Sequence, residues 1–205
     1  MPLRPMFPLG SVLVPSMVLP LHVFEPRYRA LVKDCLAGDR EFGVTLIERG
    51  SEVGGGDIRA MAGTMAEIVR SEEYDDGRWG LVAVGVRRIR VLGWRPDAPY
   101  PVAEVEDWPD EVASEPDLAG RYEARVAQLR RVLALAVELG MEGSPMVELA
   151  DDPSLGSHQI AILAPFGPLD RQRLLTAPGP DERLALEAEL LEEQELLLRA
   201  RIADG

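Results

Sequence analysis

The sequence predicts an α+β protein with a β-rich first half and a helical second half. Residues up to about 110 form short apolar runs between prolines and glycines, which is typical of buried strands. After residue 120 the apolar side chains repeat at helical spacing, and residues 109–120, rich in Pro, Asp and Glu, separate the two patterns. We therefore expect two domains, residues 1–110 and residues 111–205.

The first half is expected to form a small closed or half-open barrel, because it contains several strands and little helix. The predicted strands are residues 5–9, 17–25, 42–48, 61–73, 79–94 and 102–108. Asp76 and Gly77 give the turn of a hairpin between two of them. Gly85, inside the longest run, marks a bend in the sheet.

One helix is inserted among these strands. Pro26 suits its first turn and Gly38 suits its end. Between them, apolar side chains fall at i, i+3, i+4, i+7 and i+8, which gives one apolar stripe: Tyr28, Leu31, Val32, Cys35 and Leu36. Lys33 lies off this stripe, towards water.

The second half is expected to form a small helical bundle. Its first helix has a seam with steps of four and three residues: Tyr122, Val126, Leu129, Leu133 and Ala136. Gly140 ends that helix, and shorter helices are predicted over residues 153–163 and 168–175. The last helix starts at Pro180 and has a broad apolar face: Leu184, Leu186, Leu190, Leu191, Leu197, Leu198 and Ile202.

The charge of the chain excludes several classes of partner. With 35 acidic and 22 basic residues the net charge is −13, which opposes nonspecific binding to DNA or to an anionic membrane. Residues 5–24 carry no charged side chain, but four prolines and glycines interrupt them, so neither a spanning helix nor a secretory signal is expected. We expect a cytoplasmic protein.

The residues that carry catalysis are scarce. Lys33 is the single lysine, and its neighbours do not form the phosphate-binding loop of an ATPase. The three glycines within residues 51–57 predict a turn instead. Cys35 lies on the core stripe, and His22 and His158 are far apart in sequence, so neither a thiol nucleophile nor a metal site is expected. We expect no catalytic residue, no cofactor and no metal.

Two groups of residues remain as candidates for binding. Arg87, Arg88 and Arg90 lie on one predicted strand, with Arg88 and Arg90 expected to face water and Ile89 and Val91 the core. A solvated strand face explains them, and an anion or RNA contact is the alternative. The other group is apolar, and it either belongs to the core or forms a binding rim at the strand ends: Met17, Val18, Trp79, Trp94, Tyr100 and Trp108.

These segments resemble the N-terminal substrate-binding domain of Lon proteases. The resemblance is carried by FPLGSVLVPSMVLPLHVFEPRYRALVKDCL at 7–36, FGVTLI at 42–47, VGGGD at 53–57, GTMAEI at 63–68, VGVRRIRV at 84–91 and PYPVAEVE at 99–106. LDRQRLL at 169–175 and ERLALEAELL at 182–191 are similar to the closing helices of that domain. The resemblance covers almost the whole chain.

The resemblance implies a PUA-like β-barrel followed by a helical bundle. In full-length Lon this domain helps to hold unfolded or degron-bearing proteins for an attached ATPase and Ser–Lys protease, and a similar barrel serves in a eukaryotic ubiquitin-ligase receptor. Neither catalytic domain is in this sequence, so we do not expect peptidase activity.

Three functions are compatible with the sequence. The first is a stand-alone module that binds unfolded or partly folded client proteins through their exposed apolar segments, as an adaptor or holdase. Such a module would work with a separate ATPase or protease or self-associate weakly. The second is an RNA-binding PUA-like protein, which the net charge opposes. The third is an enzyme whose site the sequence does not reveal.

Overall fold

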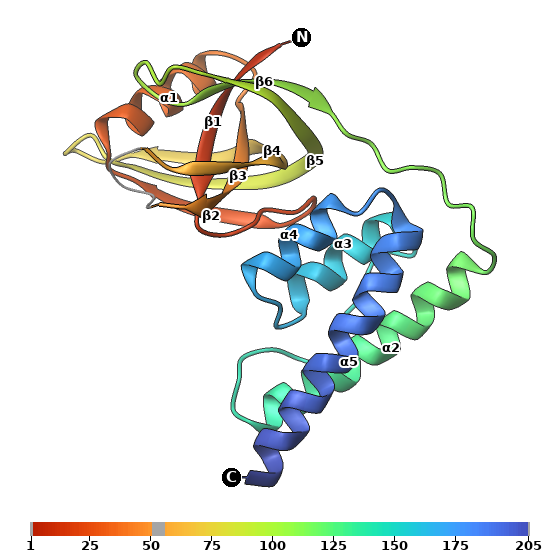
Figure 1. Cartoon of the computed structure of the whole chain (residues 1–205). Helices are drawn as coiled ribbons and strands as arrows, with labels where there is room; N and C mark the ends of the chain where they lie inside the picture. The colour runs from red at the N-terminus through yellow and green to blue at the C-terminus, as the bar shows by residue number, and fades with distance from the viewer. Residues whose placement is uncertain (1, 51–55, 205) are drawn as a thin grey trace. The chain divides into compact units, whose positions relative to one another are not determined.

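The chain divides into two compact units, a barrel unit of Met1–Pro109 and a helical unit of Asp110–Gly205. The computed structural model of the protein describes residues 2–50 and 56–204 (Figure 1). The turn predicted over residues 51–57 lies mostly outside these described residues. Each unit is considered by itself below.

The barrel unit is one curved sheet with a helix inserted in its sequence. Its elements in chain order are β1 (Leu3–Leu9), β2 (Val18–Val23), α1 (Pro26–Ala37), β3 (Glu41–Arg49), β4 (Ile58–Glu73), β5 (Trp79–Arg95) and β6 (Val102–Asp107). Among the described residues the strand order is β2-β5-β4-β3-β1-β6, and an additional β5–β6 pairing closes the sheet on itself. The predicted α+β class with one inserted helix is confirmed.

The pairing of β1 with β3 is parallel, while the other strand pairs are antiparallel. Parallel neighbours need a long crossover between them. Here β2 and α1 form that crossover. Strand β2 therefore does not pair with β1, which precedes it in the chain, but pairs with β5. This topology is what leaves two strand edges open, as described below.

Strand β5 changes partner at Gly85. Its first half pairs with β2, from Trp79 to Val84, and its second half pairs with β6, from Ile89 onward. The register with β4 also shifts at Gly85, so the predicted bend coincides with the change of partner. A Cβ atom at Gly85 would lie 2.4 Å from the carbonyl oxygen of Val14, because the segment before β2 crosses β5 here. Only glycine allows this approach without displacement of the backbone.

Helix α1 has the bounds and the buried face that the sequence predicts. Pro26 is its first residue, and the Gly38 N–H donates to the Cys35 carbonyl at its end (3.1 Å). Its buried side chains are Tyr28, Leu31, Val32 and Cys35. They complete the main apolar core of the barrel unit together with residues of β1, β3 and β5.

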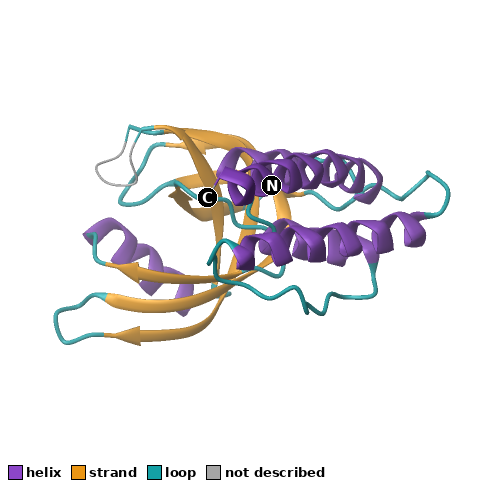
Figure 2. Ribbon diagram, turned by 90° about the horizontal axis from the view of Figure 1, so that it is seen from below, coloured by secondary structure: helices purple, strands orange, loops and turns teal. Residues whose placement is uncertain are grey.

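The helical unit consists, among the described residues, of α2 (Leu118–Glu138), α3 (Pro153–Leu163), α4 (Pro168–Thr176) and α5 (Pro180–Asp204). The two long helices α2 and α5 lie side by side (Figure 2). Three of the four helices begin with proline, whose missing N–H is not needed in the first turn. The predicted starts at residues 153, 168 and 180 are therefore confirmed.

The apolar seam between α2 and α5 differs from the prediction at one residue. Leu129, Leu133 and Ala136 of α2 are buried, as are Leu184 and other leucines of α5. Leu197, expected on the apolar face, is 58% exposed, because its neighbour Leu198 occupies the buried position of that turn. No helix of the described chain is long and apolar enough to cross a membrane.

Candidate functional site

The six residues predicted to bind polypeptide do not form one surface. Trp79 and Tyr100 lie in the barrel core, each only 9% exposed, and the Tyr100 hydroxyl donates to the Asp34 carboxylate (2.6 Å). Trp94 is half-buried against a second apolar cluster, with the Arg59 guanidinium 4.7 Å from its ring centroid. The Tyr100 hydroxyl and the face of the Trp94 ring are thus engaged within the barrel, and Trp79 is buried in its core.

The remaining three predicted residues lie at two places. The Trp108 ring stacks with the guanidinium groups of Arg88 (4.7 Å) and Arg90 (4.1 Å). Met17 and Val18 lie together at the start of β2, where Val18 is 57% exposed. The Gly85 N–H donates to the Met17 carbonyl (2.9 Å), which fixes the orientation of the β2 backbone.

Strand β2 has one open edge. Its whole length pairs with β5, and no strand of the described residues pairs with its other edge. Backbone groups alternate between the two edges of a strand. Because the Met17 carbonyl faces β5, the backbone groups of Val18, Pro20 and His22 face the open edge. Proline in a strand is confined to such edges, since it has no N–H to donate to a neighbour.

Strand β1 has an open edge at its end. It pairs with β6 only through Leu3, Arg4 and Pro5, whereas its pairing with β3 runs from Met6 to Leu9. The Met6 N–H donates to the Pro101 carbonyl, on the β6 side (2.9 Å). Because backbone groups alternate along a strand, the carbonyl of Pro8 also faces the β6 side. Pro8 lies beyond Pro5, the last residue of β1 that pairs with β6.

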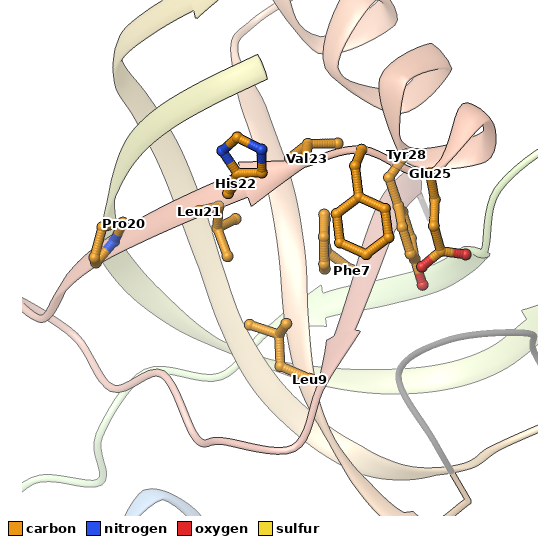
Figure 3. Close-up of a pocket in the computed structure, with 9 residues that line it drawn as sticks. Phe7, Leu9, Pro20, Leu21, His22, Val23, Glu25 and Tyr28 are labelled. Carbon is orange, nitrogen blue, oxygen red and sulfur yellow. The ribbon is translucent and has the colours of Figure 1, made fainter. Parts of the chain in front are cut away.

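A pocket of about 240 Å³ lies between these two strands, and we call it the β1–β2 slot (Figure 3). Its lining residues are Phe7, Leu9, Pro20, Leu21, His22, Val23, Phe24, Glu25 and Tyr28. Most of them are apolar, and Phe24, at the end of β2, is 54% exposed. The slot therefore combines an apolar pocket with a strand edge to which no strand of residues 2–50 and 56–204 is paired.

The charges around the slot are balanced. The Arg27 Nε donates to the Glu25 carboxylate (3.1 Å), and the Arg27 guanidinium lies 4.5 Å from the centroid of the Tyr28 ring. The Phe7 and Tyr28 rings stack at 4.1 Å. Burial raises the pKa of Tyr28 to about 12, so its hydroxyl is neutral at pH 7. A neutral, aromatic pocket favours an uncharged apolar side chain.

Met17 and Val18, predicted for an apolar rim, do not line this slot, and the prediction does not include Phe7, Phe24 or Tyr28. In the sequence, Phe7 and Tyr28 resemble ordinary core residues. Their position in the slot depends on strands β1 and β2, which border the slot only after the barrel has folded. One signal was available: Pro20 in an apolar strand indicates an edge strand. The structure adds the exposed side chain of Phe24 at the same end of β2.

The arginines of β5 do not form a phosphate-binding patch. Arg87 donates to both carboxylate oxygens of Glu41 (2.5 and 2.7 Å) and to Asp107 (2.9 Å). The prediction that Arg88 faces water is wrong: Arg88 is 3% exposed. Its side chain lies on the predicted face of the strand, but Trp108, whose N–H donates to the Arg88 carbonyl (2.9 Å), folds back over it.

The polar groups considered for catalysis are buried or lie close to other polar side chains. Burial raises the pKa of the Cys35 thiol to about 12, so a thiolate is not available at neutral pH. Lys33 is exposed and lies 3.5 Å from Glu73 on the barrel surface. His22 lies at the rim of the slot, 3.4 Å from an Arg78 nitrogen. No cluster of metal-ligating side chains occurs among residues 2–50 and 56–204.

The helical unit contains a buried ionic cluster that the sequence does not reveal. Arg183 and Glu187, four residues apart on α5, are both 0% exposed. Arg183 donates to Asp110 (3.2 Å from Nη1) and to the Ser157 hydroxyl (2.8 Å). Neither carboxylate oxygen of Glu187 has a hydrogen-bond partner among the described residues, and burial raises the pKa of Glu187 well above its ordinary value.

Comparison with known proteins relates both units to one family. Residues 4–193 match the family model of the ATP-dependent protease La (LON) substrate-binding domain. Lon protease 2 of Myxococcus xanthus is 31% identical over 199 residues, a match that covers 95% of this chain and 24% of that protein. A LON peptidase N-terminal domain and RING finger protein of Schizosaccharomyces pombe is 25% identical, and the match covers 89% of this chain and 43% of that protein. The chain thus spans less than half the length of these relatives.

Two solved structures show the same fold. The Lon N-terminal domain protein from Xanthomonas campestris is 31% identical, with a TM-score of 0.66 over 90% of this chain and 96% of that one. The N-terminal domain of a Mycobacterium avium complex Lon protease has a TM-score of 0.69 at 18% identity, covering 93% and 98% of the two chains. Since the family model covers nearly the whole chain and agrees with these relatives, the chain belongs to the Lon substrate-binding domain family.

Proposed function

We propose that this protein is a non-catalytic module that binds unfolded or partly folded polypeptides through their exposed apolar segments. The observation that carries the proposal is the β1–β2 slot, an apolar pocket at an open strand edge, in a member of a substrate-binding family. Apolar binding surfaces at the rim of a barrel suit segments that a folded protein hides and an unfolded one exposes.

The size of the slot supports a polypeptide ligand over a small-molecule substrate. Pockets that enclose drug-sized ligands have volumes of about 300–1,000 Å³. The slot, at about 240 Å³, is smaller and suits one or two bulky side chains of a longer chain. Together with the buried thiol of Cys35 and the surface position of Lys33, this supports binding rather than chemistry as the role of the slot.

The proposed role is that of an adaptor or holdase. In this role the module holds a client, and a separate ATPase or protease acts on that client. Peptidase activity is not part of the proposal, because the matched Lon proteases are about four times as long as the region that they share with this chain. Weak self-association is compatible with this role.

No specific observation favours RNA as the ligand. Arg87 is engaged by two carboxylates, Arg90 lies 3.9 Å from Glu106, and Arg88 is covered by Trp108. The net charge of −13 adds a general repulsion of phosphate backbones. We therefore retain polypeptide binding as the single proposed function.

Titration of the protein with unfolded casein and with a folded control protein of similar charge tests this function. We expect casein to bind at least ten times more tightly, because only the unfolded chain presents apolar segments to the slot; a tenfold ratio corresponds to about 1.4 kcal/mol. Fluorescence anisotropy of the labelled proteins gives both dissociation constants. Equal affinities for the two ligands would rule out recognition of unfolded chains.

A further inference from the structure

The two strands that border the β1–β2 slot offer backbone groups as well as an apolar pocket. On β2 the alternation turns the N–H groups of Val18 and His22 and the carbonyls of Val18, Pro20 and His22 towards the open edge. An open edge of this kind is a template for a further strand. Pockets that accept alternate side chains next to such an edge are the signature of recognition by strand addition.

From this arrangement we propose that a client segment binds as an added β-strand on the open edge of β2 and inserts one bulky apolar side chain into the slot, against Leu21 and the stacked rings of Phe7 and Tyr28. This inference rests on the proposed function and specifies how the slot takes its ligand. The ligand class is an extended, uncharged, apolar stretch of polypeptide. Helical and folded ligands are excluded, because their backbone N–H and carbonyl groups are already paired.

Two prolines, Pro20 in the slot and Pro8 on β1, disfavour edge-to-edge pairing of two copies of this protein. Pro20 lies in the middle of β2 and removes one N–H from the open edge, and Pro8 does the same on β1. Two β2 strands placed edge to edge would each face a missing donor at the centre of the ladder. An added strand without proline supplies a full set of N–H groups to the carbonyls of Val18, Pro20 and His22, so it loses fewer hydrogen bonds than a second copy does.

The neutral lining sets the preferred side chain. Glu25 is already paired with Arg27, so a cationic ligand gains no free carboxylate in the pocket. The stacked rings of Phe7 and Tyr28 instead offer an aromatic wall. We therefore expect phenylalanine, leucine or methionine to be preferred over lysine or glutamate at the inserted position.

Amide hydrogen exchange measured by NMR on the full chain tests the proposal directly. The probe is a heptapeptide of alternating valine and threonine with one central phenylalanine, used at about 100 times its dissociation constant. The Val18 and His22 amides face the open edge and should exchange about 100-fold more slowly with the peptide bound, since exchange then requires the free state. Leu19 and Leu21, whose amides pair with β5, are protected in both states and serve as internal controls.

Two N-methylated forms of the same peptide provide the second arm. Methylation of one alternating set of amides should weaken binding at least tenfold, and methylation of the other set should change it little, because an added strand presents only every second amide to β2. Unchanged exchange of Val18 and His22, equal affinity of both methylated forms, or failure of the heptapeptide to bind would overturn strand addition. The casein titration is independent of these results, so strand addition can fail while binding of unfolded chains stands.

Discussion

Replacement of Arg183 by methionine is expected to lower the free energy of unfolding of the helical unit by about 3–5 kcal/mol, the cost of removing one partner of a buried ion pair. Arg183 is 0% exposed and joins α5 to Asp110 and to Ser157 of α3. Without it the Asp110 carboxylate keeps its charge in a partly buried position and loses its cationic partner. Methionine fills a similar volume, so the loss reports the polar contacts rather than a cavity.

Urea unfolding followed by circular dichroism measures this effect, and Arg199→Met is the matched control. Arg199 is also on α5 and pairs with Glu195, but its side chain is 63% exposed. Exposed pairs of this spacing contribute about 0.3–0.5 kcal/mol. A loss for Arg183→Met no larger than the loss for Arg199→Met would show that the buried pair does not hold the bundle together.

The second large effect concerns Glu187, whose replacement should stabilise the protein as the pH rises. Both carboxylate oxygens lack a hydrogen-bond partner in the described part of the chain, and burial raises the pKa of Glu187 despite the nearby charges of Arg183 and Arg125. Tyr122 of α2 also faces this carboxyl, and burial raises its pKa as well. A carboxyl in such surroundings is stable only when it carries its proton.

The direction of the pH dependence follows from proton binding. In the unfolded chain Glu187 titrates near about pH 4.3. Between that pH and its higher native pKa, the native state binds more protons than the unfolded state. The contribution of Glu187 to stability is therefore fully present below about pH 4.3 and is lost as the pH rises through the native pKa. The slope is at most about 1.4 kcal/mol per pH unit.

Comparison of the wild type with Glu187→Gln between pH 4.5 and pH 9 isolates this contribution. The variant cannot titrate at position 187, so its advantage in unfolding free energy should grow with pH. Glu193→Gln, on an exposed turn of α5, should stay within about 0.5 kcal/mol of the wild type at every pH. A constant difference between the wild type and Glu187→Gln would mean that Glu187 is ionised in the native state and carries its charge at no cost.

Local signals in the sequence predicted the helices well. Pro26 and Gly38 bound α1, and Pro153 begins α3, because capping and proline effects act within one turn of the chain. The face of Arg88 was also predicted correctly from alternation. Its burial was not, because it depends on Trp108, a residue twenty positions away that returns to β5 only in the folded barrel.

The candidate site and the buried charges depend on long-range contacts. The slot exists because β1 pairs in parallel with β3 while β2 pairs with β5, and no local pattern indicates this pairing. Arg183 and Glu187, four residues apart on a helix, resemble a solvent-exposed pair in sequence. They are buried because α3 and the start of the helical unit supply partners for Arg183, which neighbouring residues on α5 do not reveal.

The most direct test of the account is the affinity for unfolded casein of two matched variants, Phe24→Ser and Val69→Ser. Phe24 lines the slot and is 54% exposed, whereas Val69, on β4, is 55% exposed and lies outside the slot. Burial of a phenylalanine side chain contributes about 1.5–3 kcal/mol, so Phe24→Ser should weaken binding about 10- to 100-fold, and Val69→Ser should leave it unchanged. Equal affinities of the two variants would contradict the assignment of the β1–β2 slot as the place where this protein holds its clients.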